Sequence, residues 1–218
     1  MKNVVGKIRQ IIRHKDWSIN KYLHPTAQLC RRSVAQIPYA IGPESRVRNA
    51  QIGRYTYITR RVLIDSARIG NYCSIGPESI IGGLGLHPSA HFSTSPITYS
   101  PRNPIAAILG ATGFDLGFQE HAEVQIEADV WIGARAIIAD GVKIGVGAII
   151  GANTFVGKDV PPYAVFYGSP PKVHRFRFSS EVIARLLETQ WWTKSPDQID
   201  TGQLRRIIAS SSGSGSTG

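Results

Sequence analysis

Cysteine is scarce in this chain of 218 residues, and long hydrophobic runs are missing altogether. The two cysteines, Cys30 and Cys73, stand far apart and form no CxxC pair. This argues against both a disulfide framework and a structural zinc site. No stretch approaches the roughly 20 apolar residues that a membrane-spanning helix needs. The N-terminus also lacks the apolar core of a signal peptide, so we expect a cytoplasmic protein.

Acidic residues are the second scarcity, because 15 Asp and Glu oppose 25 Lys and Arg and leave a net charge of +10. Much of this charge lies in residues 1–35, where Asp16 is the one acidic residue. The basic residues there are Lys2, Lys7, Arg9, Arg13, Lys15, Lys21, Arg31 and Arg32. Such a charge raises the question of nucleic acid, but no RNP, zinc-finger or helix-turn-helix pattern accompanies it. We expect no nucleic-acid partner, since an anionic small molecule or lipid surface explains the charge as well.

What the chain does contain is a six-residue repeat. The aliphatic residues of two runs carry it: Ile52, Ile58, Ile64, Ile69, Ile75 and Ile81, then Ile126, Ile132, Ile138, Ile144, Ile150 and Val156. Gly or Ala follows most of them, and the first run contracts by one residue after Ile64. A period of six fits neither an α-helix nor an alternating strand. It indicates short strands with a corner every hexad, three hexads to a triangular coil, and a small residue at a cramped or positive-φ corner.

The repeat also divides the chain. Residues 36–178 are expected to form an all-β parallel β-helix, from which a long loop at residues 83–123 protrudes. Residues 1–35 form a basic segment that begins with an amphipathic helix, which we interpret as a cap. Contact of this helix with an anionic membrane is the alternative. Residues 179–209 are predicted to be helical, and residues 210–218, only Ser, Gly and Thr, are predicted to be disordered.

Four motifs surround the hexads: IGGLGLHPSAHFSTSP at 81–96, DVWIG at 129–133, VGKDVPPY at 156–163 and GSPPK at 168–172. In these motifs and their order the chain resembles the hexapeptide-repeat acyltransferases. The match is to the branch of xenobiotic acetyltransferases and polysaccharide or sugar O-acetyltransferases, over residues 45–195. The resemblance implies a left-handed parallel β-helix with helical termini, assembled as a homotrimer. It also implies transfer of an acetyl group from acetyl-CoA to a small-molecule or saccharide acceptor, as in polysaccharide biosynthesis.

The resemblance further implies that His87 is the catalytic general base, because relatives carry a histidine at the start of the loop. An imidazole titrates near neutral pH and can take the proton of a hydroxyl that attacks a thioester. His91 is the alternative base, and we assign it instead to the acceptor pocket, together with Ser93 and Thr94. Two acidic residues are candidates for orienting the imidazole: Glu78 and Asp115.

Relatives bind acetyl-CoA along the outside of the coil, in a groove shared by two subunits. Small residues let the pantetheine arm approach the backbone, and basic residues suit the phosphates. The matching cofactor-binding positions are Trp131, Ala134, Ala152, Gly157, Lys158, Lys172 and Arg175. Trp131 is expected to point outward, over the groove or into the trimer interface. Ala134 and Ala152 are equally explained as small corner residues.

Alternatives to O-acetylation of a sugar, sugar nucleotide or polysaccharide precursor stay open. One is N-acetylation of an amino sugar, another is acetylation of an antibiotic, and a third is a β-helix scaffold without activity. A β-helical zinc protein of the carbonic-anhydrase kind needs three histidines across a subunit interface. His87, His91 and His121 do not have that spacing, so we expect no metal.

Overall fold

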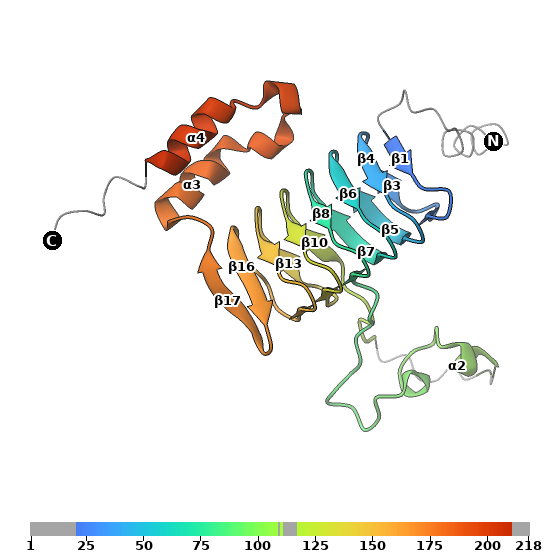
Figure 1. Cartoon of the computed structure of the whole chain (residues 1–218). Helices are drawn as coiled ribbons and strands as arrows, with labels where there is room; N and C mark the ends of the chain where they lie inside the picture. Colours follow the sequence, from blue (N-terminus) through green and yellow to red (C-terminus); the bar gives the residue numbers. More distant parts are fainter. Residues whose placement is uncertain (1–20, 109, 111–116, 211–218) are drawn as a thin grey trace.

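The computed structural model describes residues 21–108, 110 and 117–210. Its strands wind into a coil with three flat faces, and successive coils pair in parallel (Figure 1). The first face contains β1 (Lys21–Leu23), β4 (Tyr39–Ile41), β6 (Thr56–Ile58), β8 (Ser74–Ile75), β11 (Trp131–Ile132), β14 (Ile149–Ile150) and β16 (Ala164–Gly168). The strand β17 (Pro171–Phe176) closes this face as an antiparallel hairpin with β16. The expected left-handed parallel β-helix is confirmed.

Two strands run through the corner between the second and third faces: β5 (Arg46–Ile52) and β7 (Leu63–Ile69). The second face adds β2 (Gln28–Leu29), β9 (Ile80–Ile81), β12 (Ile137–Ile138) and β15 (Phe155–Val156). The third face adds β3 (Val34–Ala35), β10 (Val124–Ile126) and β13 (Lys143–Ile144). The contraction of the repeat after Ile64 falls inside β7, where Ser66 bends the strand with a φ of 52°. A continuous bent strand therefore takes the place of an ordinary corner there.

The aliphatic residue of each hexad points into the coil. All twelve are at most 2% exposed and belong to one core: Ile52, Ile58, Ile64, Ile69, Ile75, Ile81, Ile126, Ile132, Ile138, Ile144, Ile150 and Val156. Equivalent residues stack in adjacent coils, with Ile126 opposite Ile144 and Ile132 opposite Ile150. Both pairs are 18 residues apart, as three hexads to a coil require.

The small residue after the inward aliphatic is required by close stacking of the corners. A Cβ added to Gly133 would lie 2.5 Å from the backbone nitrogen of Ala152 in the next coil. Gly133 itself does not have a positive φ, which occurs two residues later, at Arg135 (57°). At Gly133 the cramped corner therefore applies, because successive corners lie one strand spacing apart, whereas Gly82, which follows Ile81, has a positive φ of 64°.

The C-terminal segment folds back along the corner between the third and first faces. Its main helices are α3 (Ser180–Thr189) and α4 (Thr201–Ala209), with the 3-10 turns η2 (Trp191–Thr193) and η3 (Pro196–Gln198) between them. Val182, Leu186 and Ile207 pack against Val146 and Tyr163 of the coil. Side chains of the corner also bond the turn: Arg54 to Thr193 O, Asn71 to Trp192 O and Tyr72 to Lys194 O. The helices therefore cover one edge of the solenoid as well as its end.

The strands extend further towards the N-terminus than the sequence suggested. β1, β2 and β3 lie within residues 21–35, so the described solenoid starts at Lys21 and not at residue 36. The expected amphipathic helix with its membrane contact, and the tail at residues 211–218, lie outside the described residues. Among the helices that are described, none is long and apolar enough to cross a membrane.

Candidate active site

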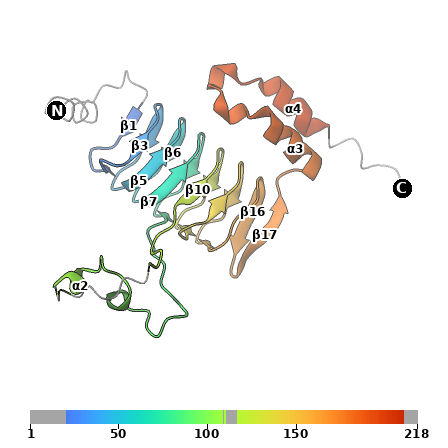
Figure 2. The ribbon, with the colours of Figure 1, turned by 180° about the vertical axis from the view of Figure 1, so that it is seen from behind.

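A long loop leaves the coil after β9, at the corner between the second and third faces, and returns at β10. It projects on the side away from α3 and α4 (Figures 1 and 2). Its described part contains the turn η1 (Pro96–Thr98) and the helix α2 (Pro104–Ile108). On the return, Ile126 pairs with Ile69 of β7, so the coil continues as if no loop were present. The loop is thus an insertion at a corner, close to the boundaries expected from the sequence.

His87 lies near the start of this loop, with an exposed side chain. Its Nδ1 atom is 2.9 Å from the carbonyl oxygen of Thr94 and 2.8 Å from the hydroxyl oxygen of Tyr99. Because a carbonyl oxygen only accepts, the first contact requires the proton on Nδ1. In a neutral imidazole the lone pair then lies on Nε2, which has no hydrogen bond from the described residues. This tautomer presents Nε2 as the base.

Tyr99 supports the imidazole from within the loop. It is 2% exposed, and its ring stands edge-on to His87 and to Phe118 at centroid distances of 6.1 and 5.5 Å. Loss of hydration raises the pKa of the Tyr99 phenol above its ordinary value, so the hydroxyl is neutral at pH 7. Sequence reasoning missed this residue, since its one signal was an aromatic residue in an apolar loop.

The two ends of the loop are joined just below His87. The amide of Leu86 donates to the carbonyl oxygen of Glu120 at 2.8 Å. The Glu120 carboxylate accepts from the Ser100 hydroxyl at 2.7 Å. Glu120 therefore links the outgoing chain, the η1 region and the returning chain, and limits the movement of His87 relative to the coil.

Of the two acidic candidates for orienting His87, Glu78 is described by the structure and makes its hydrogen bonds elsewhere. Glu78 lies at a corner, where it accepts from Arg61 and from Arg135, the latter at 3.2 Å. The hydrogen bond from Arg61, the larger cause, and the charge of Arg61 lower the pKa of Glu78. The expectation for Glu78 was wrong because these arginines of adjacent coils satisfy its carboxylate. Asp115 lies outside the described residues.

The residues assigned to the acceptor pocket are neighbours in the loop. Their contacts in the structure are with other residues of the same loop. His91 is half-buried against Phe92, with ring centroids 4.2 Å apart, and its Nε2 is buried without a partner. The Ser93 hydroxyl accepts from the amide of Ser95 at 3.1 Å. Thr94 contributes its carbonyl oxygen to His87. The role of these residues in acceptor binding stays a prediction.

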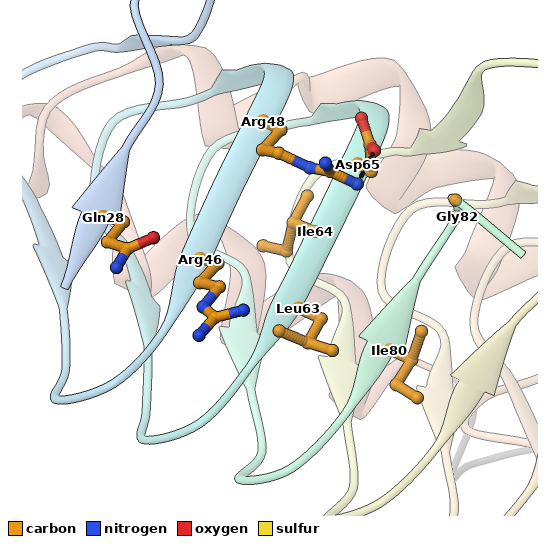
Figure 3. A pocket seen from close by; sticks show the side chains of 9 residues that line it. Gln28, Arg46, Arg48, Leu63, Ile64, Asp65, Ile80 and Gly82 are labelled. Atoms are coloured by element: carbon orange, nitrogen blue, oxygen red, sulfur yellow. Dashed lines mark hydrogen bonds and ion pairs between the residues drawn. The ribbon is translucent and has the colours of Figure 1, made fainter. Parts of the chain in front are cut away.

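A groove of about 310 Å³ on the second face reaches the start of the loop. Its lining residues are Gln28, Arg46, Arg48, Leu63, Ile64, Asp65, Ile80, Gly82 and Gly83. Figure 3 shows the Arg48 and Asp65 side chains pointing toward each other across β5 and β7, and their ion pair measures 2.6 Å. Leu63 and Ile80 give the groove an apolar wall. Because Gly82 and Gly83 begin the loop, the groove lies beside the outgoing stem of the loop (residues 82–87), which ends at His87.

The positions matched to acetyl-CoA lie in three places on the coil, the first of which is the edge between the first and second faces. Ala134 and Ala152 follow the first face in adjacent coils, and the amide of Asn153 donates to Ala134 O at 2.9 Å. Trp131 points outward from β11 and is 56% exposed, as expected. These three positions share the edge between the first and second faces.

The remaining positions lie elsewhere on the coil. Gly157 and Lys158 directly follow β15, so they occupy the corner from which the loop leaves two coils earlier. Lys172 and Arg175 are exposed on β17, at the C-terminal end of the first face. The expected contacts of one chain are therefore spread over both edges of the second face and the C-terminal end of the first face.

The described residues include two free cysteines, of which Cys30 is exposed and Cys73 is buried. Cys73 is fully buried, and its burial raises the pKa of the thiol to about 12, so it is no thiolate at neutral pH. Residues 21–108 and 117–210 contain no cluster of three or more His, Cys, Asp or Glu that suits a metal ion.

Comparison with known proteins relates this fold and loop to a family. Residues 123–158 match the model described as bacterial transferase hexapeptide (six repeats). A chloramphenicol acetyltransferase of Morganella morganii is 37% identical over 173 residues, which are 70% of this chain and 80% of that protein. The chain belongs to the hexapeptide-repeat acetyltransferases. The expectation of an acetyl-CoA-dependent acyltransferase is thereby confirmed.

Other hexapeptide-repeat acetyltransferases are more distant. A galactoside O-acetyltransferase of Lactococcus lactis is 30% identical over 116 residues, 48% of this chain and 56% of that protein. Among solved structures, a variant of the GDP-perosamine N-acetyltransferase from Caulobacter crescentus has a TM-score of 0.50 at 20% identity. That match covers 70% of this chain and 55% of the other, and it shows the fold alone.

Proposed function

We propose that this hexapeptide-repeat acetyltransferase transfers the acetyl group to a hydroxyl of a small molecule, with His87 as general base. The observation that carries the proposal is the 2.9 Å contact between His87 Nδ1 and Thr94 O. This contact holds the proton on Nδ1 and leaves Nε2 as the basic atom. The 2.8 Å contact with the Tyr99 hydroxyl fixes the ring further.

The reaction needs one base and no covalent intermediate on the protein. Nε2 of His87 takes the proton of the acceptor hydroxyl as its oxygen attacks the carbonyl carbon of the acetyl thioester. The tetrahedral intermediate collapses with cleavage of the carbon–sulfur bond. The departing CoA sulfur takes the proton back from the imidazolium, so that a neutral imidazole is regenerated. An acetyl ester and free CoA are the products.

Acetyl-CoA binding is proposed to involve two subunits of a homotrimer. The matched positions Ala134 and Ala152 lie on one edge of the second face, while Gly157 and Lys158 lie on the other. Two chains side by side would bring opposite edges together. Exposed apolar residues support packing through the first and second faces: Tyr57, Trp131 and Phe155. Beyond the exposed Val34 of β3, the outward residues of the third face are polar: Gln51, Arg68, Gln125 and Lys143.

The acceptor that has the most support is a chloramphenicol-like xenobiotic, because the relatives of that name are matched over most of their length. The apolar wall formed by Leu63 and Ile80 beside the loop stem suits such a molecule. A sugar hydroxyl, which the motifs around His87 favoured, is the second candidate. It has support from the galactoside O-acetyltransferase, which matches over a shorter segment.

An acceptor panel tests the proposed function. Purified protein is incubated with acetyl-CoA and chloramphenicol, a galactoside or glucosamine, and release of free CoA thiol is followed. We expect acceptor-dependent release with a hydroxyl acceptor and a product heavier by one acetyl group in mass spectrometry. Turnover with amine acceptors alone would contradict O-acetylation. An active preparation of the chloramphenicol relative serves as the positive control.

Filling the groove tests where the acceptor binds. Leu63 is 43% exposed and faces outward from β7, so Leu63→Trp adds volume to the groove without entering the core. We expect the KM for the acceptor to rise about tenfold while the KM for acetyl-CoA stays within twofold, because only one substrate loses contact area. Val34→Trp, an exposed position on the third face, is the matched control. An unchanged acceptor KM in Leu63→Trp would exclude the groove.

A further inference from the structure

The corner between β12 and β13 contains a buried acidic residue with no role in the reaction described above. Asp140 is 9% exposed. Its carboxylate accepts from three consecutive backbone amides: Gly83 at 3.3 Å, Leu84 at 2.9 Å and Gly85 at 3.2 Å. Among the described residues no Lys, Arg or His forms an ion pair with it. The backbone N–H groups of the loop stem are therefore its partners.

The corner of Asp140 also contacts the returning end of the loop. β12 is the neighbour of β9, with Ile138 opposite Ile81, so Asp140 lies one coil beyond the point where the loop leaves. The next residue, Gly141, donates its amide to the carbonyl oxygen of Ala122 at 3.2 Å. One corner of the rigid coil thus binds the outgoing chain through a side chain and the returning chain through the backbone.

The local sequence of the stem fits this role. Three successive N–H groups converge on one anion only if the backbone curves, and such a concave arrangement is a known anion-binding geometry. Gly83 and Gly85 have φ values of 70° and 79°, which side chains other than glycine rarely adopt. Hydrogen bonds to an ionised acceptor are shorter and stronger than bonds between neutral groups. The glycines of the stem and the carboxylate of Asp140 therefore form one unit.

We propose that Asp140 is a positioning residue that fixes the loop stem, and through it His87, to the coil. The proposal rests on the proposed function of His87, which lies two residues after Gly85. The stem is the direct covalent connection between the coil and the imidazole, and proton transfer depends on the placement of the base. Loss of the carboxylate frees three amides at once, so the position of His87 becomes less defined while the coil keeps its core.

Asp140→Ala tests the proposal, with Asp200→Ala as the matched control, because Asp200 also caps a backbone amide, that of Gln203 at the start of α4, away from the stem. We expect kcat to fall about 10- to 100-fold in Asp140→Ala, with the KM for acetyl-CoA within twofold. Hydrogen exchange at residues 83–87 should accelerate in this variant alone. Asp140→Asn retains one acceptor oxygen and should lose less activity. A kcat or stem exchange equal to wild type in Asp140→Ala would overturn the proposal.

Combination with His87→Ala distinguishes positioning from a general structural effect. If Asp140 acts through His87, Asp140→Ala should cause no further loss of the residual rate in the His87→Ala protein. An equal loss on both backgrounds would contradict the positioning role. If the wild type shows no transfer to any acceptor, the proposed function fails. The exchange comparison then still decides whether Asp140 holds the stem.

Discussion

His87→Ala is expected to lower acetyl transfer about 10²- to 10⁴-fold, the range that a general base contributes. The imidazole is the one basic group that the structure orients through Thr94 O and Tyr99, and no second base is held in this way in the described part of the loop. Because His87 is exposed, its removal leaves no cavity in the core. Release of free CoA thiol with saturating acetyl-CoA and acceptor measures the loss, which should appear in kcat.

His121→Ala is the matched control for this variant. His121 is exposed at the returning end of the same loop, and its backbone carbonyl accepts a hydrogen bond from the Gln119 side chain. The His121→Ala protein should retain wild-type activity. Both His87→Ala and His121→Ala should show the wild-type melting temperature. Activity of His87→Ala within threefold of wild type would remove the base assignment. In that case His91, with its buried and unpartnered Nε2, becomes the residue to replace.

Ile138→Ala is expected to lower the free energy of unfolding by about 2–5 kcal/mol, the usual cost of truncating a buried isoleucine. Ile138 is fully buried and lies between Ile81 and Val156 of the adjacent coils. In a solenoid each coil contacts only its neighbours, so a cavity in one coil weakens two interfaces. Denaturant titration followed by circular dichroism measures the change.

The neighbouring residue provides the control, because Ile137 has the same side chain on the same strand but faces outward. Ile137→Ala should change the free energy of unfolding by about 1 kcal/mol or less. Similar losses in the two variants would show that the inward column does not dominate the stability of the coil.

The fold could be predicted from the sequence to an unusual extent because one repeat determines it. The spacing of Ile126 and Ile144 gives the register of the coils, and the small residues give the corners. Membership of the family followed from motifs that surround the same hexads. These signals are local in the chain, so no long-range contact had to be guessed.

The arrangement around His87 could not be predicted in the same way. The loop has no period, and Tyr99 and Thr94 contact the imidazole through turns that only the folded chain defines. Glu78 was a poor choice because the sequence does not show that Arg61 and Arg135 converge on it. The course of α3 and α4 along a corner likewise depends on contacts with Val146 and Tyr163, far away in sequence.

The insertion of the loop at a corner has a consequence for how such proteins diversify. Since β10 pairs with β7 directly, the hydrogen-bonded ladder between these two strands does not include the residues of the loop. Loops of other lengths and sequences can therefore be exchanged at this junction without a new scaffold having to evolve. Under the proposed function, acceptor preference is then a property of an interchangeable loop, whereas the positions proposed to bind acetyl-CoA lie on the coil itself.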